Sequence, residues 1–118
     1  MNIETATYQD LFDAAVRGLA SQGWERSMDE NDDVCAYRGE CGRKCAIGWL
    51  IDKDDYRPEI EGYDASKIFA CTNQKMQFLQ AMQNAHDGHA KPQLMLSEFM
   101  GLSEDYKLEW PADVGKTI

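Results

Sequence analysis

Four cysteines and two histidines are the side chains of this sequence best suited to bind a metal ion. Cys35, Cys41 and Cys45 lie close together in the chain, and Cys71 follows later. Thiolates and imidazoles are the ligands that Zn²⁺ prefers in a tetrahedral structural site. However, the spacing Cys-x5-Cys-x3-Cys differs from the paired Cys-x2-Cys arrangement typical of zinc sites. We therefore expect no metal or other cofactor, and a zinc site built on these four cysteines is the alternative.

A nucleophilic thiol is the second chemistry that these residues could support. A cysteine attacks as its thiolate, which forms when a neighbouring base or positive charge lowers its pKa. Arg43 and Lys44 directly precede Cys45, and His86 is a base that the fold could bring near. The sequence alone does not place them together. We expect a protein that is not an enzyme, with a small thiol- or zinc-dependent enzyme built on Cys35, Cys45 and His86 as the alternative.

His86 and His89 stand three positions apart near the expected end of a helix. Two imidazoles at this spacing can face the same way and share a metal or a proton. A histidine in the last helical turn more often interacts with the free carbonyl groups of the helix terminus, which favours its charged form. The structural role is therefore the expected one.

Two clusters of acidic residues remain as candidates for binding a partner. They are Asp29, Glu30, Asp32 and Asp33 in the first cluster, and Asp52, Asp54 and Asp55 in the second. Such runs are usually solvated surface that keeps a protein soluble. They can also form a surface complementary to a basic site of another protein, or imitate the phosphates of a nucleic acid.

The charge of the chain narrows the class of partner. The formal net charge is −9, and the first 61 of the 118 residues hold 14 acids and 7 bases, so most of the excess lies there. Affinity for nucleic acids and for anionic membranes depends on clusters of Lys and Arg, which this chain lacks. We expect a protein or protein complex as the partner, and no direct contact with nucleic acid or membrane.

The N-terminal sequence and the hydropathy favour a cytoplasmic protein. The first seven residues have neither the basic start nor the apolar run of a secretory signal. No stretch reaches the roughly 18 consecutive apolar residues that span a bilayer. In the cytosol the cysteines should remain reduced thiols.

Helical periodicity predicts the elements that position these residues. Thr7 should cap a first helix over residues 8–22, in which apolar residues recur at helical spacing until Gly23 ends it. Asp64 and Asn73 should cap helices at 65–71 and 74–86.

A last helix should begin near Pro92, with Leu94 on its inward face, and end at Gly101. The aromatic tail that follows should fold back on the body. Residues 35–44 suit a short β-hairpin, and residues 45–51 suit a short buried helix, although so short an apolar run is also compatible with a strand. The predicted fold is a single, mainly α domain, a compact bundle of four to five helices with that hairpin; an α+β fold is the alternative.

One pattern in the first half resembles a known family. It consists of Leu19, Gln22-Gly-Trp24, Arg26-Ser27, Cys35-x-Tyr37-Arg38-Gly39, Gly42-x-Lys44-Cys45-Ala-Ile-Gly-Trp-Leu-Ile51 and Glu61-Gly62, with an Ala85-His86-Asp87 triplet beyond. The pattern is similar to that of short, uncharacterised proteins from tailed phages and prophages of Gram-negative bacteria. The resemblance implies a phage accessory protein, made inside an infected bacterium, that binds and inhibits a host nucleic-acid-handling or defence complex. Such a protein would be of the anti-defence or anti-CRISPR type, with imitation of DNA as one route.

Overall fold

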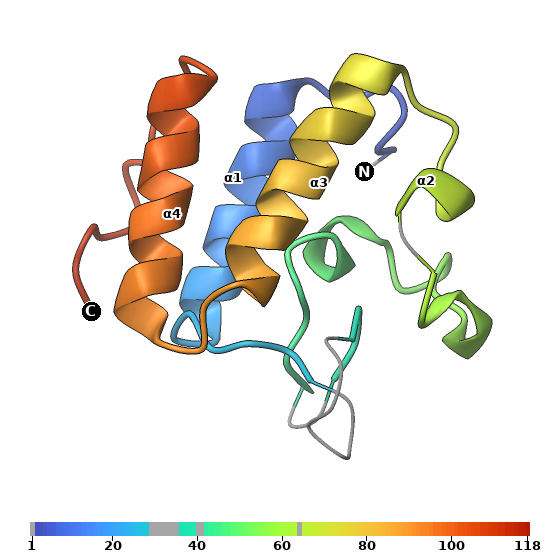
Figure 1. Ribbon diagram of the computed structural model, residues 1–118, viewed down its shortest axis with the longest axis horizontal. Coiled ribbons are helices and arrows are strands. Elements are labelled where there is room, and N and C mark those ends of the chain that lie inside the picture. Colours follow the sequence, from blue (N-terminus) through green and yellow to red (C-terminus); the bar gives the residue numbers. More distant parts are fainter. Residues whose placement is uncertain (1, 29–35, 40–41, 64) are drawn as a thin grey trace.

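The computed structural model describes residues 2–28, 36–39, 42–63 and 65–118. These residues form a mainly helical domain (Figure 1). Its helices, in chain order, are α1 (Tyr8–Ser21), the 3₁₀ turns η2 (Gly48–Leu50) and η3 (Pro58–Ile60), α2 (Ala65–Ile68), α3 (Asn73–Asp87) and α4 (Pro92–Asp105). No helix within these ranges has the length and hydropathy of a membrane-spanning segment. The predicted fold class is confirmed.

The three long helices lie side by side and form one half of the molecule (Figure 1). The rings of Tyr8 on α1 and Phe78 on α3 stack 4.6 Å apart, and Phe12 on α1 meets Phe99 on α4 at 6.3 Å. The described residues between 36 and 70 cover the other side with turns and the short helices η2, η3 and α2. One core therefore lies among the long helices and extends to the side that faces the irregular half.

Helix α1 forms as the sequence predicts. The Thr7 hydroxyl accepts a hydrogen bond from the Asp10 amide at 3.1 Å, which satisfies one free donor of the first turn. The apolar stripe of this helix is buried, and Gly23 (φ +70°) and Trp24 (φ +60°) turn the chain away in the left-handed conformation.

The predicted boundaries of the later helices need correction. Thr72, not Asn73, caps α3, because its hydroxyl accepts from the Lys75 amide at 3.2 Å. Gly101 does not end the last helix, which continues to Asp105, and Leu94 is half exposed (49%) instead of facing inward. Asp64, the predicted cap of α2, lies outside the described residues.

The C-terminal tail packs on the helices through its aromatic residues, as predicted. Trp110 lies 5.9 Å from the Phe12 ring and 6.2 Å from the Trp24 ring, and Tyr106 meets Phe78 at 4.8 Å. Aromatic pairs at these separations add to the stability that burial of their area provides.

Residues 45–51 form a turn and the 3₁₀ helix η2 instead of a strand. The predicted hairpin before them is represented, among the residues with described positions, by one antiparallel bridge between Arg38 and Lys44. Helix η2 packs directly on α1, with the Trp49 ring against the backbone of Gly18.

The carboxylate of Glu61 joins two segments of the irregular half. It accepts hydrogen bonds from the backbone amides of Tyr37 (2.9 Å) and Arg38 (3.1 Å) and from the Tyr56 hydroxyl (2.6 Å). Burial, and then the bond to Glu61, raise the pKa of Tyr56 to about 12. Tyr37, Arg38 and Glu61 all belong to the sequence pattern that resembles the phage proteins, and their bonds hold these two segments together.

Candidate functional site

The second acidic cluster lies on an exposed turn that follows η2. The carbonyl oxygen of Asp52 accepts from the amides of Asp55 (2.9 Å) and Tyr56 (3.1 Å), which closes the turn. Asp52, Asp54 and Asp55 are all solvent-exposed. The turn thus presents three carboxylates and the ammonium group of Lys53 within four consecutive exposed residues.

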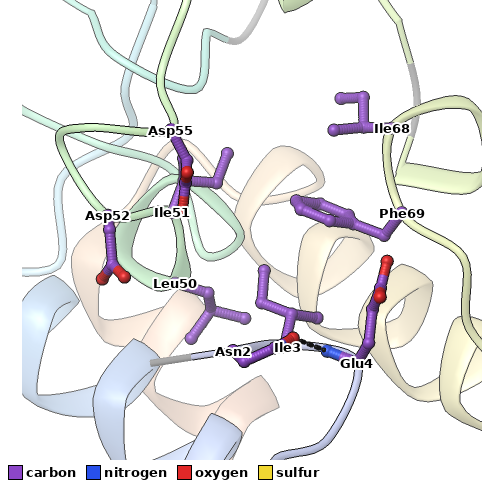
Figure 2. Close-up of a pocket in the computed structure, with 9 residues that line it drawn as sticks. All are labelled: Asn2, Ile3, Glu4, Leu50, Ile51, Asp52, Asp55, Ile68 and Phe69. Carbon is purple, nitrogen blue, oxygen red and sulfur yellow. Dashed lines mark hydrogen bonds between the residues drawn. The ribbon is translucent and has the colours of Figure 1, made fainter.

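A groove of about 450 Å³ lies beside this turn (Figure 2). We call it the acidic groove, and its described lining residues are Asn2, Ile3, Glu4, Leu50, Ile51, Asp52, Asp55, Ile68 and Phe69. Five of these nine residues are apolar and three carry a carboxylate, whereas none of the nine is basic. The groove therefore combines an apolar floor with a negative rim.

Three segments that are far apart in the sequence form the acidic groove. The N-terminal turn provides Ile3, the last residue of η2 and the residue after it are Leu50 and Ile51, and the last residue of α2 and the residue after it are Ile68 and Phe69. Figure 2 shows the Ile3 side chain and the Phe69 ring pointing toward the middle of the hollow, with the acidic turn on the opposite side from Ile68 and Phe69. Ile68 and Phe69 are only partly buried, so apolar surface remains accessible there.

Two contacts fix the N-terminal wall of the groove. The Glu4 carboxylate accepts from the Ala70 amide at 2.9 Å, which joins the N-terminal turn to the end of α2. From α3, the ammonium group of Lys75 donates to the carbonyl oxygens of Ile3, Glu4 and Ala6 at 3.1, 3.0 and 2.8 Å. The turn that carries Ile3 and Glu4 is thus joined both to α3 and to the segment that follows α2.

Replacing Lys75 with methionine is expected to lower the free energy of unfolding by about 2 kcal/mol, since three charge-assisted bonds are lost while the apolar stem is kept. Lys67→Met, on the exposed side of α2, is the matched control and should change stability by less than about 0.5 kcal/mol. Urea unfolding followed by circular dichroism measures both. Equal stability of the two variants would show that Lys75 does not hold the wall.

The first acidic cluster, Asp29, Glu30, Asp32 and Asp33, lies outside the described residues, as do Cys35 and Cys41. Of the residues predicted to bind a partner, Asp52 and Asp55 line the groove and Asp54 lies between them in the sequence. The prediction missed Glu4 and the apolar floor. The acidic run marks only one wall, and no local pattern shows that residues 2–4 and 68–69 approach it.

Cys45 is buried and poorly suited to nucleophilic attack. It is 1% exposed, and its sulfur accepts a hydrogen bond from the Gly48 amide at 3.3 Å. Burial raises the pKa of the Cys45 thiol to about 12, so the thiol stays protonated near neutral pH. Cys71 is a partly exposed free thiol, and burial raises its pKa as well. Neither environment favours the thiolate that a thiol-dependent enzyme needs.

Cys45 is expected to resist iodoacetamide in the folded protein at pH 8, whereas Cys71 should react. A pKa near 12 instead of 9.0 reduces the thiolate population about a thousandfold. Peptide mass spectrometry before and after unfolding in urea measures the labelling. Because the folded state holds this proton more tightly, stability should fall as the pH rises above about 9. Rapid labelling of Cys45 in the native state would revive the thiol-enzyme hypothesis.

His86 has a structural role different from the predicted one. Its ring is 0% exposed, and Nε2 accepts a hydrogen bond from the Ser27 amide at 2.9 Å, while Nδ1 lies 2.8 Å from the Asp87 carboxylate. An accepting Nε2 carries no proton, so Nδ1 is the donor to Asp87. The predicted interaction with the helix terminus is therefore wrong: the imidazole joins the end of α3 to the Ser27 segment. His89 is separate and pairs with Glu98 at 3.3 Å.

The described part of the chain contains no group of three or more His, Cys, Asp and Glu side chains arranged to hold a metal ion. The acidic groove is the place where the structure brings predicted site residues together with accessible apolar surface. Comparison of the chain with protein-family models, with curated proteins and with solved structures finds no match.

Proposed function

We propose that this chain is a small binding protein that places its acidic side against a basic site of another protein. The observation that carries the proposal is the exposed turn with Asp52, Asp54 and Asp55 beside a groove in which Ile68 and Phe69 keep accessible apolar surface. Negative surfaces of this kind accelerate association with basic partners and select against acidic ones.

The partner that this chemistry fits is a protein complex that handles nucleic acid, because such complexes carry basic clefts for phosphate groups. The resemblance to phage proteins supplies the biological setting: an accessory protein in the bacterial cytoplasm that inhibits a host nucleic-acid-handling or defence complex. Occupying a phosphate-binding cleft with carboxylates would block it by imitation of DNA. No catalytic step is part of this proposal.

The charge of the turn can be removed with little change in shape. The test variant combines Asp52→Asn, Asp54→Asn and Asp55→Asn. Its affinity for the captured partner should fall about tenfold, because each of the three exposed charges contributes a few tenths to about one kcal/mol. Affinity capture from a Gram-negative bacterial lysate, followed by titration of the captured complex, measures the effect. Substitution of the same residues by lysine should abolish capture.

The matched control removes three exposed acids from α4, which lies on the far side of the molecule from α2 (Figure 1). This control variant changes the net charge by the same amount, from −9 to −6, through Glu98→Gln, Glu104→Gln and Asp105→Asn combined. This control should keep most of the affinity. Equal losses in the two variants would mean that overall charge, and not the acidic turn, determines binding.

The first acidic cluster is tested separately. Lysine substitutions at Asp29, Glu30, Asp32 and Asp33 should also abolish capture if both clusters face the partner. Unchanged capture by that variant would refute an electrostatic contribution of this cluster to partner binding.

A further inference from the structure

We propose that the acidic groove binds one large apolar side chain of a protein partner at a position flanked by lysine or arginine. This inference rests on the proposed function and names what the acidic side recognises. It follows from the shape of the groove, its accessible apolar surface and the sign of its rim.

The apolar part of the groove has room for a side chain from outside. Ile3, Leu50 and Ile51 are 4%, 1% and 7% exposed and form a floor that is fixed in the core. Ile68 and Phe69 are only partly buried, and Figure 2 shows the Phe69 ring directed into the hollow. A volume of about 450 Å³ lies within the range of sites that bind small organic groups. Burying a leucine, methionine or phenylalanine side chain there would cover this surface.

The rim determines which residues can flank that side chain. Glu4, Asp52 and Asp55 line the groove, and its described lining includes no basic residue. Phosphate and anionic lipid headgroups would be repelled by these carboxylates, whereas ammonium and guanidinium groups would be attracted. The long stems of lysine and arginine can also lie along the apolar edge while their charges reach the carboxylates.

The groove is preorganised for such a segment. The Lys75 bonds and the Glu4–Ala70 bond fix two of its three walls before any partner arrives. Preorganised walls lower the ordering cost of binding. A buried apolar anchor surrounded by a polar rim is the usual arrangement of a protein–protein interface.

Isoleucine methyl groups allow a direct test, because the sequence has six isoleucines and three of them line the groove. Ile3, Ile51 and Ile68 are the reporters, while Ile47 and Ile60 lie outside it and serve as internal controls. The methyl-labelled protein is titrated with a Gly-Lys-Phe-Lys-Gly peptide. Two matched peptides replace Phe by Ser, or both Lys by Glu.

We expect the Lys-Phe-Lys peptide to shift the three groove methyls and leave the control methyls in place. The Ser peptide and the Glu peptide should each need at least about tenfold higher concentration, since one loses the anchor and the other the charge complement. Asp52→Asn with Asp55→Asn should weaken the Lys-Phe-Lys peptide, and Ile68→Ala should weaken it without changing the net charge.

Several results would overturn the inference. Equal binding of the Ser peptide would make the contact purely electrostatic, and equal binding of the Glu peptide would make it purely apolar. Shifts of the groove methyls on concentrating the protein alone would identify a second copy of this chain as the occupant. If the groove methyls do not shift but capture still depends on charge, only this inference is refuted. If capture is unchanged when the acidic turn is neutralised, the proposed function is refuted.

Discussion

Replacing Gly48 with alanine is expected to destabilise the protein by about 3 kcal/mol or more, which corresponds to a fall in melting temperature on the order of 10 °C for a chain of this length. A Cβ atom at Gly48 would lie well under 3.0 Å from the carbonyl oxygen of Tyr37 and 2.9 Å from its carbonyl carbon. Both atoms belong to the backbone, so no side-chain rotation can relieve the overlap. Residues 36–39 and η2 would have to separate.

Gly101→Ala is the matched control for this prediction. Gly101 lies inside α4, and nothing is found within 4 Å of an added Cβ atom. Alanine there should raise stability by about 0.5–1 kcal/mol, because glycine is the poorer helix former. Thermal unfolding followed by circular dichroism measures both variants. A melting temperature of Gly48→Ala equal to that of the wild type would contradict the close contact between Tyr37 and η2.

Replacing His86 with alanine is the second substitution with a large expected effect, about 3 kcal/mol of lost stability. The change opens a cavity at a fully buried site and leaves the Ser27 amide without its acceptor. His89→Ala is the control and should cost less than about 0.5 kcal/mol, since His89 is nearer the surface and its partner Glu98 is exposed. Urea unfolding followed by tryptophan fluorescence measures both.

The tautomer of His86 gives an independent readout. Nitrogen NMR should show the proton on Nδ1 and none on Nε2, because Nε2 accepts from the Ser27 amide. A proton on Nε2 in the native protein, or equal stability losses for the two histidine variants, would contradict the structural role assigned to His86.

The elements that the sequence predicts well are those set by local chemistry. The hydroxyl of Thr7 and the apolar stripe after it mark the start and the buried face of α1 within the local sequence. The prediction that α4 ends at Gly101 was wrong because helix propensity is a weak preference. Phe99 and Ser103, on either side of Gly101, are both buried, and the helix continues through the glycine. The short apolar run after Cys45 has too few residues for its period to be read, so its 3₁₀ conformation depends on packing against α1.

The sequence predicts the acidic turn of the candidate site but not the groove beside it, because the groove depends on long-range packing. Asp52, Asp54 and Asp55 form a visible acidic run, but the groove beside them depends on two distant segments. Ile3 is placed by Lys75, and Phe69 is placed by α2 and the bond between Ala70 and Glu4. These are long-range contacts that no local pattern contains.

Cys45 and His86 show how little residue type alone determines. Their types suggested a metal or a nucleophile, yet burial gives Cys45 and His86 structural roles. The residues of the family-like pattern behave in the same way, since Gly48 permits a close backbone contact and Glu61 joins two segments. Residue type alone does not distinguish a reactive group from a packed one.

The salt dependence of partner binding tests the central proposal most directly. The dissociation constant of the captured complex should rise at least tenfold between about 50 and about 500 mM salt, because a shorter screening length weakens the attraction between the two charged surfaces. The variant that replaces Asp52, Asp54 and Asp55 by asparagine should show a weaker salt dependence than the wild type. A dissociation constant that stays constant across this range, or the same salt dependence in that variant, would contradict binding through the acidic turn.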